Sequence, residues 1–207
     1  MSPAARRLES ALIPLHAPPS GPGWNHASMA EWLGDAPLVP AAVLVAVRDD
    51  GEENIIFTRR HDRLAKHAGQ VAFPGGGMEP GDDDMIDTAL RESEEEIGLP
   101  RETVTPLGYL DCFETISGFR VTPVVARIAA DAPALVPNAG EVADVFEVPL
   151  AFFLSRDNLR SYTVEYRGTH RPMVEFRFGG FRIWGATAAM LLNMLKRMGE
   201  PWIPPHP

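Results

Sequence analysis

Cysteine is almost missing from this chain of 207 residues, because Cys112 is the only one. A disulfide within the chain needs two cysteines, so none can form. Proteins of a reducing compartment do without disulfides. We therefore expect a cytoplasmic protein.

The chain also lacks an apolar run that would take it into or across a membrane. Its first residues, through Ser10, contain two arginines and no sustained apolar core of the kind found in signal peptides. The apolar stretch at 187–198 is too short, and lies too close to Lys196 and Arg197, to span a bilayer. We expect neither a leader nor a membrane partner.

Positive charge is scarce, since 19 lysines and arginines face 28 aspartates and glutamates and the formal net charge is -9. Such a balance disfavours general binding to nucleic acid or to anionic membranes. An anionic ligand must therefore find a locally basic site. The densest basic segment contains Arg59, Arg60, Arg63, Lys66 and His67, and its alternative interpretation is a surface loop that balances nearby acids.

Hydrophobic residues make up 45% of the chain, which suffices for one domain with a sizeable core. A stretch rich in proline and glycine before residue 25 predicts an N-terminal extension at 1–37 that wraps on the domain. The main domain is expected at 38–198 and an irregular tail at 199–207.

Apolar patterning and turn residues predict the regular elements of this domain. A helix at 84–97 ends where Gly98 and Pro100 provide a C-cap and a breaker. The last helix, at 187–198, is expected to pack against the sheet, and a homodimer contact is its alternative role. Strands are expected at 41–47, 54–58, 104–110, 121–129, 145–150, 174–178 and 181–184, and helices at 6–13, 84–97 and 187–198.

Three glutamates of the helix at 84–97 share one face. Glu92, Glu95 and Glu96 are spaced i, i+3 and i+4, so their side chains project along one stripe, whereas Glu94 points away. Like charges at this spacing repel one another by roughly a few tenths of a kcal/mol per pair, and by more where water is excluded. A solvated acidic face is the ordinary alternative. A nearby cation would offset the repulsion.

Hard divalent cations suit this cluster, because Mg²⁺ or Mn²⁺ prefers oxygen ligands and keeps water and substrate phosphates in its shell. The glycine turn Gly75–Gly77 precedes the helix, and glycine lets a backbone carbonyl approach closely. We assign the metal ligands to Glu92, Glu95, Glu96 and the backbone of Gly76. The expected substrate is therefore phosphorylated.

The same segment resembles the Nudix hydrolases, whose signature places a glycine and an acidic residue before an R-E-U-x-E-E-x-G-U core, where U is aliphatic. Two departures are visible: Ser93 occupies an aliphatic position, and an aspartate replaces the usual acidic glutamate. The register is open between Gly77 with Asp83 and Gly76 with Asp82, the second with a spacer one residue longer. The core itself reads Arg91-Glu92-Ser93-Glu94-Glu95-Glu96-Ile97-Gly98-Leu99.

Segments on both sides narrow the resemblance to the coenzyme A pyrophosphatase branch of that family, and together they cover roughly residues 40 to 195. His61 and Ala65 depart from the pattern of the branch, which bears on the substrate more than on the reaction. The resembling segments are 57–60, 66–76, 121–125, 141–142, 148–150 and 183–188.

The resemblance implies an α/β fold, namely an α/β/α sandwich with a mixed sheet and a catalytic loop-helix-loop. It implies metal-dependent hydrolysis of a pyrophosphate bond in coenzyme A or acyl-coenzyme A, giving 3',5'-ADP and 4'-phosphopantetheine, with Mg²⁺ or Mn²⁺ as cofactor. In this interpretation Glu92, Glu95 and Glu96 hold metal and act in catalysis, while Arg91 orients a carboxylate. The substrate-binding residues are expected to be Arg59, Arg60, Lys66, His67, Gly75 and Gly76.

The general base and the substrate stay open at this level. Glu141 is our choice for the base and Glu114 is a second candidate; each has a solvated loop carboxylate as its alternative, which we favour for Glu114. A pyrophosphatase for ADP-ribose or another nucleotide sugar is the rival enzyme. A ligand-sensing module without turnover is the rival outside enzymes, and the intact glutamate triad argues against it.

Overall fold

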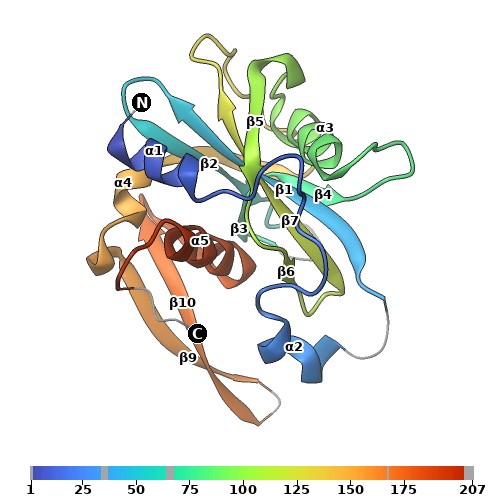
Figure 1. The fold of residues 1–207 in the computed structure, drawn as a ribbon, viewed down its shortest axis with the longest axis vertical. Coiled ribbons are helices and arrows are strands. Elements are labelled where there is room, and N and C mark those ends of the chain that lie inside the picture. The colour runs from blue at the N-terminus through green and yellow to red at the C-terminus, as the bar shows by residue number, and fades with distance from the viewer. Residues whose placement is uncertain (1, 34–36, 64–67, 167, 203–207) are drawn as a thin grey trace.

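Strand β1, Val39–Asp49, runs through the centre of the main sheet (Figure 1). The computed structural model describes residues 2–33, 37–63, 68–166 and 168–202. β1 pairs in parallel with β7, Phe119–Ile128, and antiparallel with β2, Glu53–Arg60, and β4, Gly75–Gly77. Both faces of β1 are buried, which explains its continuous apolar run.

The remaining strands of this sheet extend it on both sides of β1. The order along the sheet is β3-β2-β1-β7-β5, while β4, β6 and β8 pair with β1, β7 and β2 respectively. One parallel and several antiparallel pairings make the sheet mixed, as expected. The additional strands are β3 (Val71–Ala72), β5 (Val104–Tyr109), β6 (Phe113–Glu114) and β8 (Val142–Pro149).

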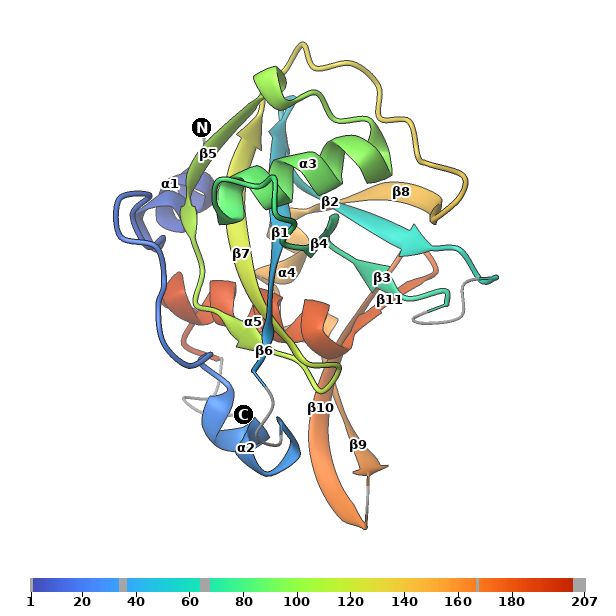
Figure 2. The same cartoon turned by 90° about the vertical axis from the view of Figure 1, so that its right-hand side faces the viewer.

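Two helices cover opposite faces of the sheet (Figure 2). On β1, Ala42 and Leu44 belong to the core under α3, Met85–Ile97, whereas Val45 and Val47 belong to the core under α5, Gly185–Arg197. The alternation follows from the two-residue period of a strand. This arrangement confirms the α/β/α sandwich. No helix in the described ranges is long and apolar enough to cross a bilayer.

A second, three-stranded sheet contributes to the core on the α5 side. Its strands are β9 (Leu159–Tyr166), β10 (Thr169–Phe178) and β11 (Phe181–Trp184), in the order β11-β10-β9. The strands expected at 174–178 and 181–184 are confirmed and pair as a hairpin around Gly179 and Gly180, both of which have positive φ. β9 was not predicted. Three short helical segments, α4 (Leu150–Phe153), η1 (Arg101–Thr103) and η2 (Arg156–Asn158), connect the strands.

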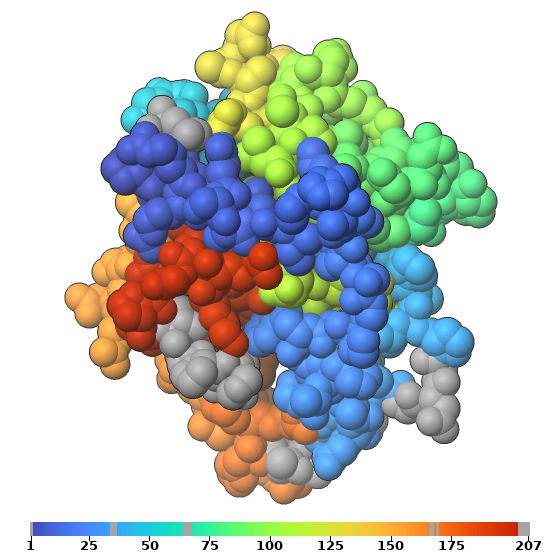
Figure 3. All heavy atoms as spheres, in the orientation of Figure 1, coloured from blue at the N-terminus to red at the C-terminus, as the bar shows by residue number. Residues whose placement is uncertain are grey.

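The N-terminal segment lies against the α5 side of the sandwich, so blue and red surfaces meet in Figure 3. Its helices are α1, Pro3–Ser10, and α2, His26–Leu33. Leu8 is buried in the core, and Ile13 forms an isolated bridge with Tyr109. The helix expected at 6–13 begins earlier because Ser2 caps it and a proline occupies its first turn. α2 was not predicted.

Candidate active site

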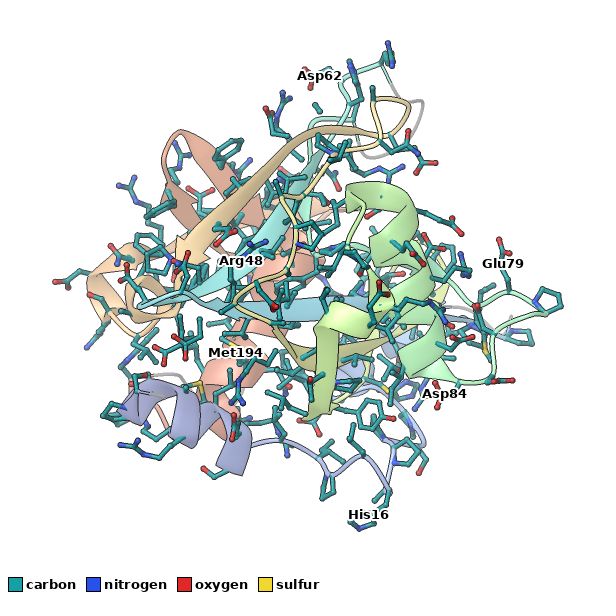
Figure 4. The ribbon with its side chains drawn as sticks, turned by 90° about the horizontal axis from the view of Figure 1, so that it is seen from above. His16, Arg48, Asp62, Glu79, Asp84 and Met194 are labelled. Carbon is teal, nitrogen blue, oxygen red and sulfur yellow. The ribbon has the colours of Figure 1, made fainter. Side chains whose placement is uncertain are left out.

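Helix α3 has well-defined ends that fix the position of its acidic face. The side chain of Asp84 accepts hydrogen bonds from the backbone N–H groups of Ile86 (2.8 Å) and Asp87 (2.9 Å), so it is the N-cap. Asp82 and Asp83, the other acidic residues just before the helix, do not cap it. Gly98 ends the helix at φ 63°, as a C-cap should. Figure 4 shows Asp84 at the start of α3.

The opposite face of α3 anchors it to the sheet. Ala89 and Ile97 are buried in the core on this side. Ser93 is also buried, and its hydroxyl donates to the Ala89 carbonyl at 2.7 Å. A serine is tolerated at this aliphatic position because its hydroxyl bonds within the helix. The glutamates on the other face are thereby directed toward β4.

Arg91 links the glycine turn to the helix. Its Nε and Nη2 donate to the two carboxylate oxygens of Asp82 at 2.8 and 3.0 Å, and Nη2 also donates to the Gly77 carbonyl at 3.0 Å. Nη1 donates to Glu92 Oε1 at 2.9 Å. Arg91 therefore makes its bidentate pair with Asp82 and a single bond with Glu92.

The two possible registers of the motif place either Asp82 or Asp83 at its acidic position, and the contacts of Asp82 bear on this choice. Asp82 is buried, and the Arg91 guanidinium holds the pKa of its carboxyl well below the ordinary range. Thr88 Oγ1 and the Glu79 backbone N–H also donate to it, each at 2.9 Å. The geometry thus favours the register with Gly76 and Asp82 over the one with Asp83.

Glu96 is the most deeply buried carboxylate of the triad, with 5% of the residue exposed. The Gly75 backbone N–H donates to its Oε2 at 3.2 Å, and Arg60 Nη1 lies 3.5 Å from its Oε1. Burial raises the pKa of Glu96 to about 7, although Gly75 and Arg60 act in the opposite direction. Its negative charge is therefore only partly compensated.

Glu92 lies directly against the glycine turn. A Cβ added to Gly76 would lie 2.4 to 2.7 Å from the Glu92 carboxylate atoms, so a larger residue there would displace that carboxylate. Gly75 has φ 154°, and its own added Cβ would lie 2.3 Å from the Ala42 carbonyl oxygen. Burial also raises the pKa of Glu92, against the opposing effect of Arg91. Gly75, Gly76, Glu92 and Glu96 thus come together.

Glu95 and Glu141 lie at the rim of this cluster. The side chain of Glu95 is 60% exposed, with an oxygen 3.6 Å from Arg91 Nη1. Glu141 is exposed in the loop before β8, and its charge contributes to the raised pKa of both Glu92 and Glu96. The His61 backbone N–H donates to the Glu141 carbonyl at 2.8 Å. Glu141 is therefore held close to the acidic cluster.

The basic residues expected to bind substrate have different partners in the structure. Arg60 reaches Glu96, whereas Arg59 pairs with Asp144 at 2.6 Å and with Asp62 at 3.1 Å. Arg63 donates to a backbone carbonyl in the loop that carries Glu141. Lys66 and His67 lie outside the described residues.

Glu114 is not a solvated loop carboxylate, so that interpretation is wrong. It is 2% exposed, and its carboxylate accepts from the Gly23 N–H at 2.9 Å and contacts His26 Nδ1 at 2.7 Å. The Asn25 side chain bonds the Glu114 backbone at both its N–H and its carbonyl. Glu114 and His26 thus fasten the N-terminal segment to β6.

The acidic cluster has the chemistry of a site for a hard divalent cation. In the described part of the chain, no three His, Cys, Asp or Glu side chains form a ready-made cage. Mg²⁺ does not need one, since one or two carboxylates with water and phosphate oxygens complete its shell. Glu92 is half-buried and Glu96 is buried beside the glycine turn, and burial raises the pKa of both. A cation would relieve that cost.

Comparison with known proteins gives three kinds of match, namely a family model, relatives similar in sequence and a solved structure. The family model described as NUDIX domain matches residues 38–165. Proteins named "Uncharacterized Nudix hydrolase NudL" from Yersinia pestis and Yersinia pseudotuberculosis are 41% identical over 159 residues, covering 76% of this chain and 79% of theirs. The crystal structure of a MutT/nudix family protein from Enterococcus faecalis is similar in fold, with a TM-score of 0.52 and 14% identity over 97% of this chain and 75% of that one.

Proposed function

The chain belongs to the Nudix family and is a Nudix pyrophosphohydrolase, and from this premise we propose that its substrate is coenzyme A or an acyl-coenzyme A. The products would be 3',5'-ADP and 4'-phosphopantetheine or its acyl form. The observation that carries the assignment of the site is the Arg91 network, which joins Gly77, Asp82 and Glu92 next to the buried Glu96.

In the proposed site the acidic cluster binds a divalent cation and the substrate diphosphate together. When held by the carboxylates of Glu92 and Glu96 and the backbone of Gly76, Mg²⁺ or Mn²⁺ would neutralise phosphate charge and acidify the attacking water. Arg91 engages Oε1 of Glu92, which leaves Oε2 to face a cation. Glu95, at the exposed rim, would act through the outer water shell.

Glu141 is the proposed general base. Its exposed carboxylate can accept a proton from the attacking water, while the loop that carries it is fixed to α3 by the Asn138 N–H, which donates to the Glu96 carbonyl at 2.8 Å. The exposure of Glu141 and its electrostatic coupling to Glu92 and Glu96 support this assignment over Glu114, which is buried against the N-terminal segment.

Arg91 acts as a positioning residue for Glu92. Because its other N–H groups are committed to Asp82 and Gly77, the guanidinium has one rotamer and presents Nη1 to Glu92 in a fixed direction. A lysine would keep the positive charge but would lack the paired N–H donors of the planar guanidinium. Arg60, beside Glu96, and Arg59 at the same end of β2 are proposed to bind substrate phosphates, together with Lys66 and His67.

The proposed substrate rests on the segments that resemble the coenzyme A branch, including 66–76 and 183–188. In the structure the second segment begins α5 next to the first, because Thr187 Oγ1 donates to the Val71 carbonyl at 3.0 Å. Two segments more than a hundred residues apart thus meet at one edge of the sheet. Their contact supports a shared role near the glycine turn.

A hydrolysis panel tests the proposal. Purified protein is assayed at millimolar Mg²⁺ and Mn²⁺ with coenzyme A, acetyl-coenzyme A, ADP-ribose and dinucleotides, and products are identified by mass spectrometry. Formation of 3',5'-ADP with 4'-phosphopantetheine at the highest kcat/KM supports the coenzyme A assignment. A higher kcat/KM for ADP-ribose would replace it with the rival substrate.

The role of Glu141 is tested on the preferred substrate of that panel. Glu141→Gln should lower kcat by about 10²- to 10⁴-fold. Glu114→Gln makes the same change at a buried carboxylate that is bonded to the N-terminal segment, and this matched control should keep the wild-type kcat. Equal kcat for Glu141→Gln and the wild type would eliminate Glu141 as the base.

A further inference from the structure

A cavity lies on the side of the molecule opposite the acidic cluster. Its volume is about 550 Å³, and it opens between the N-terminal segment before and within α2 and the C-terminal half of α5. Since α3 and α5 cover opposite faces of the sheet, this cavity is separate from the site of Glu92 and Glu96. Figure 3 shows the blue and red segments meeting on this face.

The charged wall of the cavity carries a net positive charge. Lys196 and Arg197 are two cations, whereas Asp111 is the single carboxylate among the lining residues. Arg197 Nη1 donates to both oxygens of Asp111 at 3.1 and 3.0 Å, and Asn193 Nδ2 donates to one of them at 2.9 Å. The carboxylate is therefore already satisfied. The two cations also exceed the roughly half negative charge expected at the end of α5.

The aromatic wall of the cavity is Trp24, which is half-buried and lies 6.0 Å from the ring of Phe113. Trp24 lines the cavity, so its indole offers an aromatic surface against which a flat ring can pack.

We propose that this cavity is a second binding site, for a small anion that carries a flat ring, such as a nucleoside monophosphate. Lys196 and Arg197 would bind the phosphate, and Trp24 would pack against the base. The volume of about 550 Å³ falls within the range of roughly 300–1,000 Å³ typical of small-molecule sites. Asn193, which is 4% exposed, holds Asp111 and so keeps the carboxylate away from the anion.

Isothermal titration calorimetry with AMP, on the full chain in EDTA, tests the site without relying on hydrolysis. EDTA suppresses metal-dependent binding at the acidic cluster, and Glu96→Gln repeats the titration with that cluster altered. Adenosine and inorganic phosphate are the probes for the two halves of the ligand. We expect one AMP per chain, with each half binding more weakly than AMP.

Three substitutions locate the bound AMP. Lys196→Glu should raise the Kd for AMP at least tenfold, and Trp24→Ala, which removes the aromatic surface, about threefold or more. Arg156→Glu makes the same charge change at an exposed position of η2 and should leave the Kd unchanged. Thermal unfolding of each variant verifies that it is folded.

The alternatives give distinct results. Absence of heat with millimolar AMP overturns the proposal, as does an equal rise in Kd for Lys196→Glu and Arg156→Glu. Loss of AMP binding in Glu96→Gln would place the nucleotide at the acidic cluster and overturn it too. Retained binding there, combined with loss in Lys196→Glu, supports the second site whatever substrate the enzyme hydrolyses.

Discussion

Substituting Glu96 by glutamine should stabilise the metal-free protein at alkaline pH. Burial raises the pKa of Glu96 from its ordinary value of 4.5 to about 7 in the folded chain. A carboxyl whose pKa is raised by folding favours the folded state below pH 4.5, and this advantage is lost as the pH rises toward 7. Glutamine is neutral at every pH, so the free energy of unfolding of Glu96→Gln does not carry this decrease as the pH rises.

The size of the effect follows from the same two values. The gap between 4.5 and about 7, at about 1.4 kcal/mol for each pH unit, comes to roughly 3 kcal/mol. About 2.5 kcal/mol of it falls between pH 5 and pH 8, because Glu96 of the unfolded chain is already largely ionised at pH 5. The Gly75 N–H can still donate to the amide oxygen of the glutamine, so little else changes.

Urea unfolding in EDTA at pH 5 and pH 8 measures this effect. At each pH the free energy of unfolding of the wild type is subtracted from that of the variant, and the two results are compared. The free energy of unfolding of Glu96→Gln, relative to the wild type, should rise by about 2.5 kcal/mol between the two pH values. Glu95→Gln removes a carboxylate that is 60% exposed and should change stability by under about 1 kcal/mol at either pH. A flat difference for Glu96→Gln would refute the assigned burial cost.

Two further substitutions test the glycine turn and the N-terminal contact. Gly76→Ala brings a Cβ within 2.4 Å of the Glu92 carboxylate, so kcat should fall by about 10²-fold, whereas Gly81→Ala, which meets no atom within 4 Å, should keep the wild-type kcat in the same steady-state assay. Glu114→Ala leaves His26 without its buried partner and should lower the free energy of unfolding in urea by about 2–4 kcal/mol; a loss under 1 kcal/mol would contradict the contact described here.

Features with a local cause could be predicted from the sequence. Helix α3 was expected at 84–97 and is found at Met85–Ile97, because its periodic apolar face and the terminating Gly98 are both encoded within the segment. The hairpin around Gly179 and Gly180 was likewise predictable from its turn residues. The spacing of the three glutamates placed Glu92 and Glu96 on one face.

Features that depend on distant partners could not be predicted. On β9, Ser161 and Thr163 share a face with Leu159 but are polar and exposed, so the two-residue apolar period of the strand is weak. Glu114 lies in an ordinary polar segment, and its burial depends on His26, 88 residues away. The choice between Asp82 and Asp83 likewise needed the position of Arg91 in space.

The distribution of charge around α3 explains why this site is costly to build and suited to its reaction. Arg91 makes its bidentate pair with Asp82 in the turn before α3 and donates only one hydrogen bond to Glu92. Glu96 is left with Arg60 at 3.5 Å and is buried, so burial raises its pKa. A chain selected for stability alone would pair these carboxylates fully. In the proposed site, leaving them partly unpaired would keep their oxygens available to a cation that arrives with the substrate, a common exchange of stability for activity at enzyme sites.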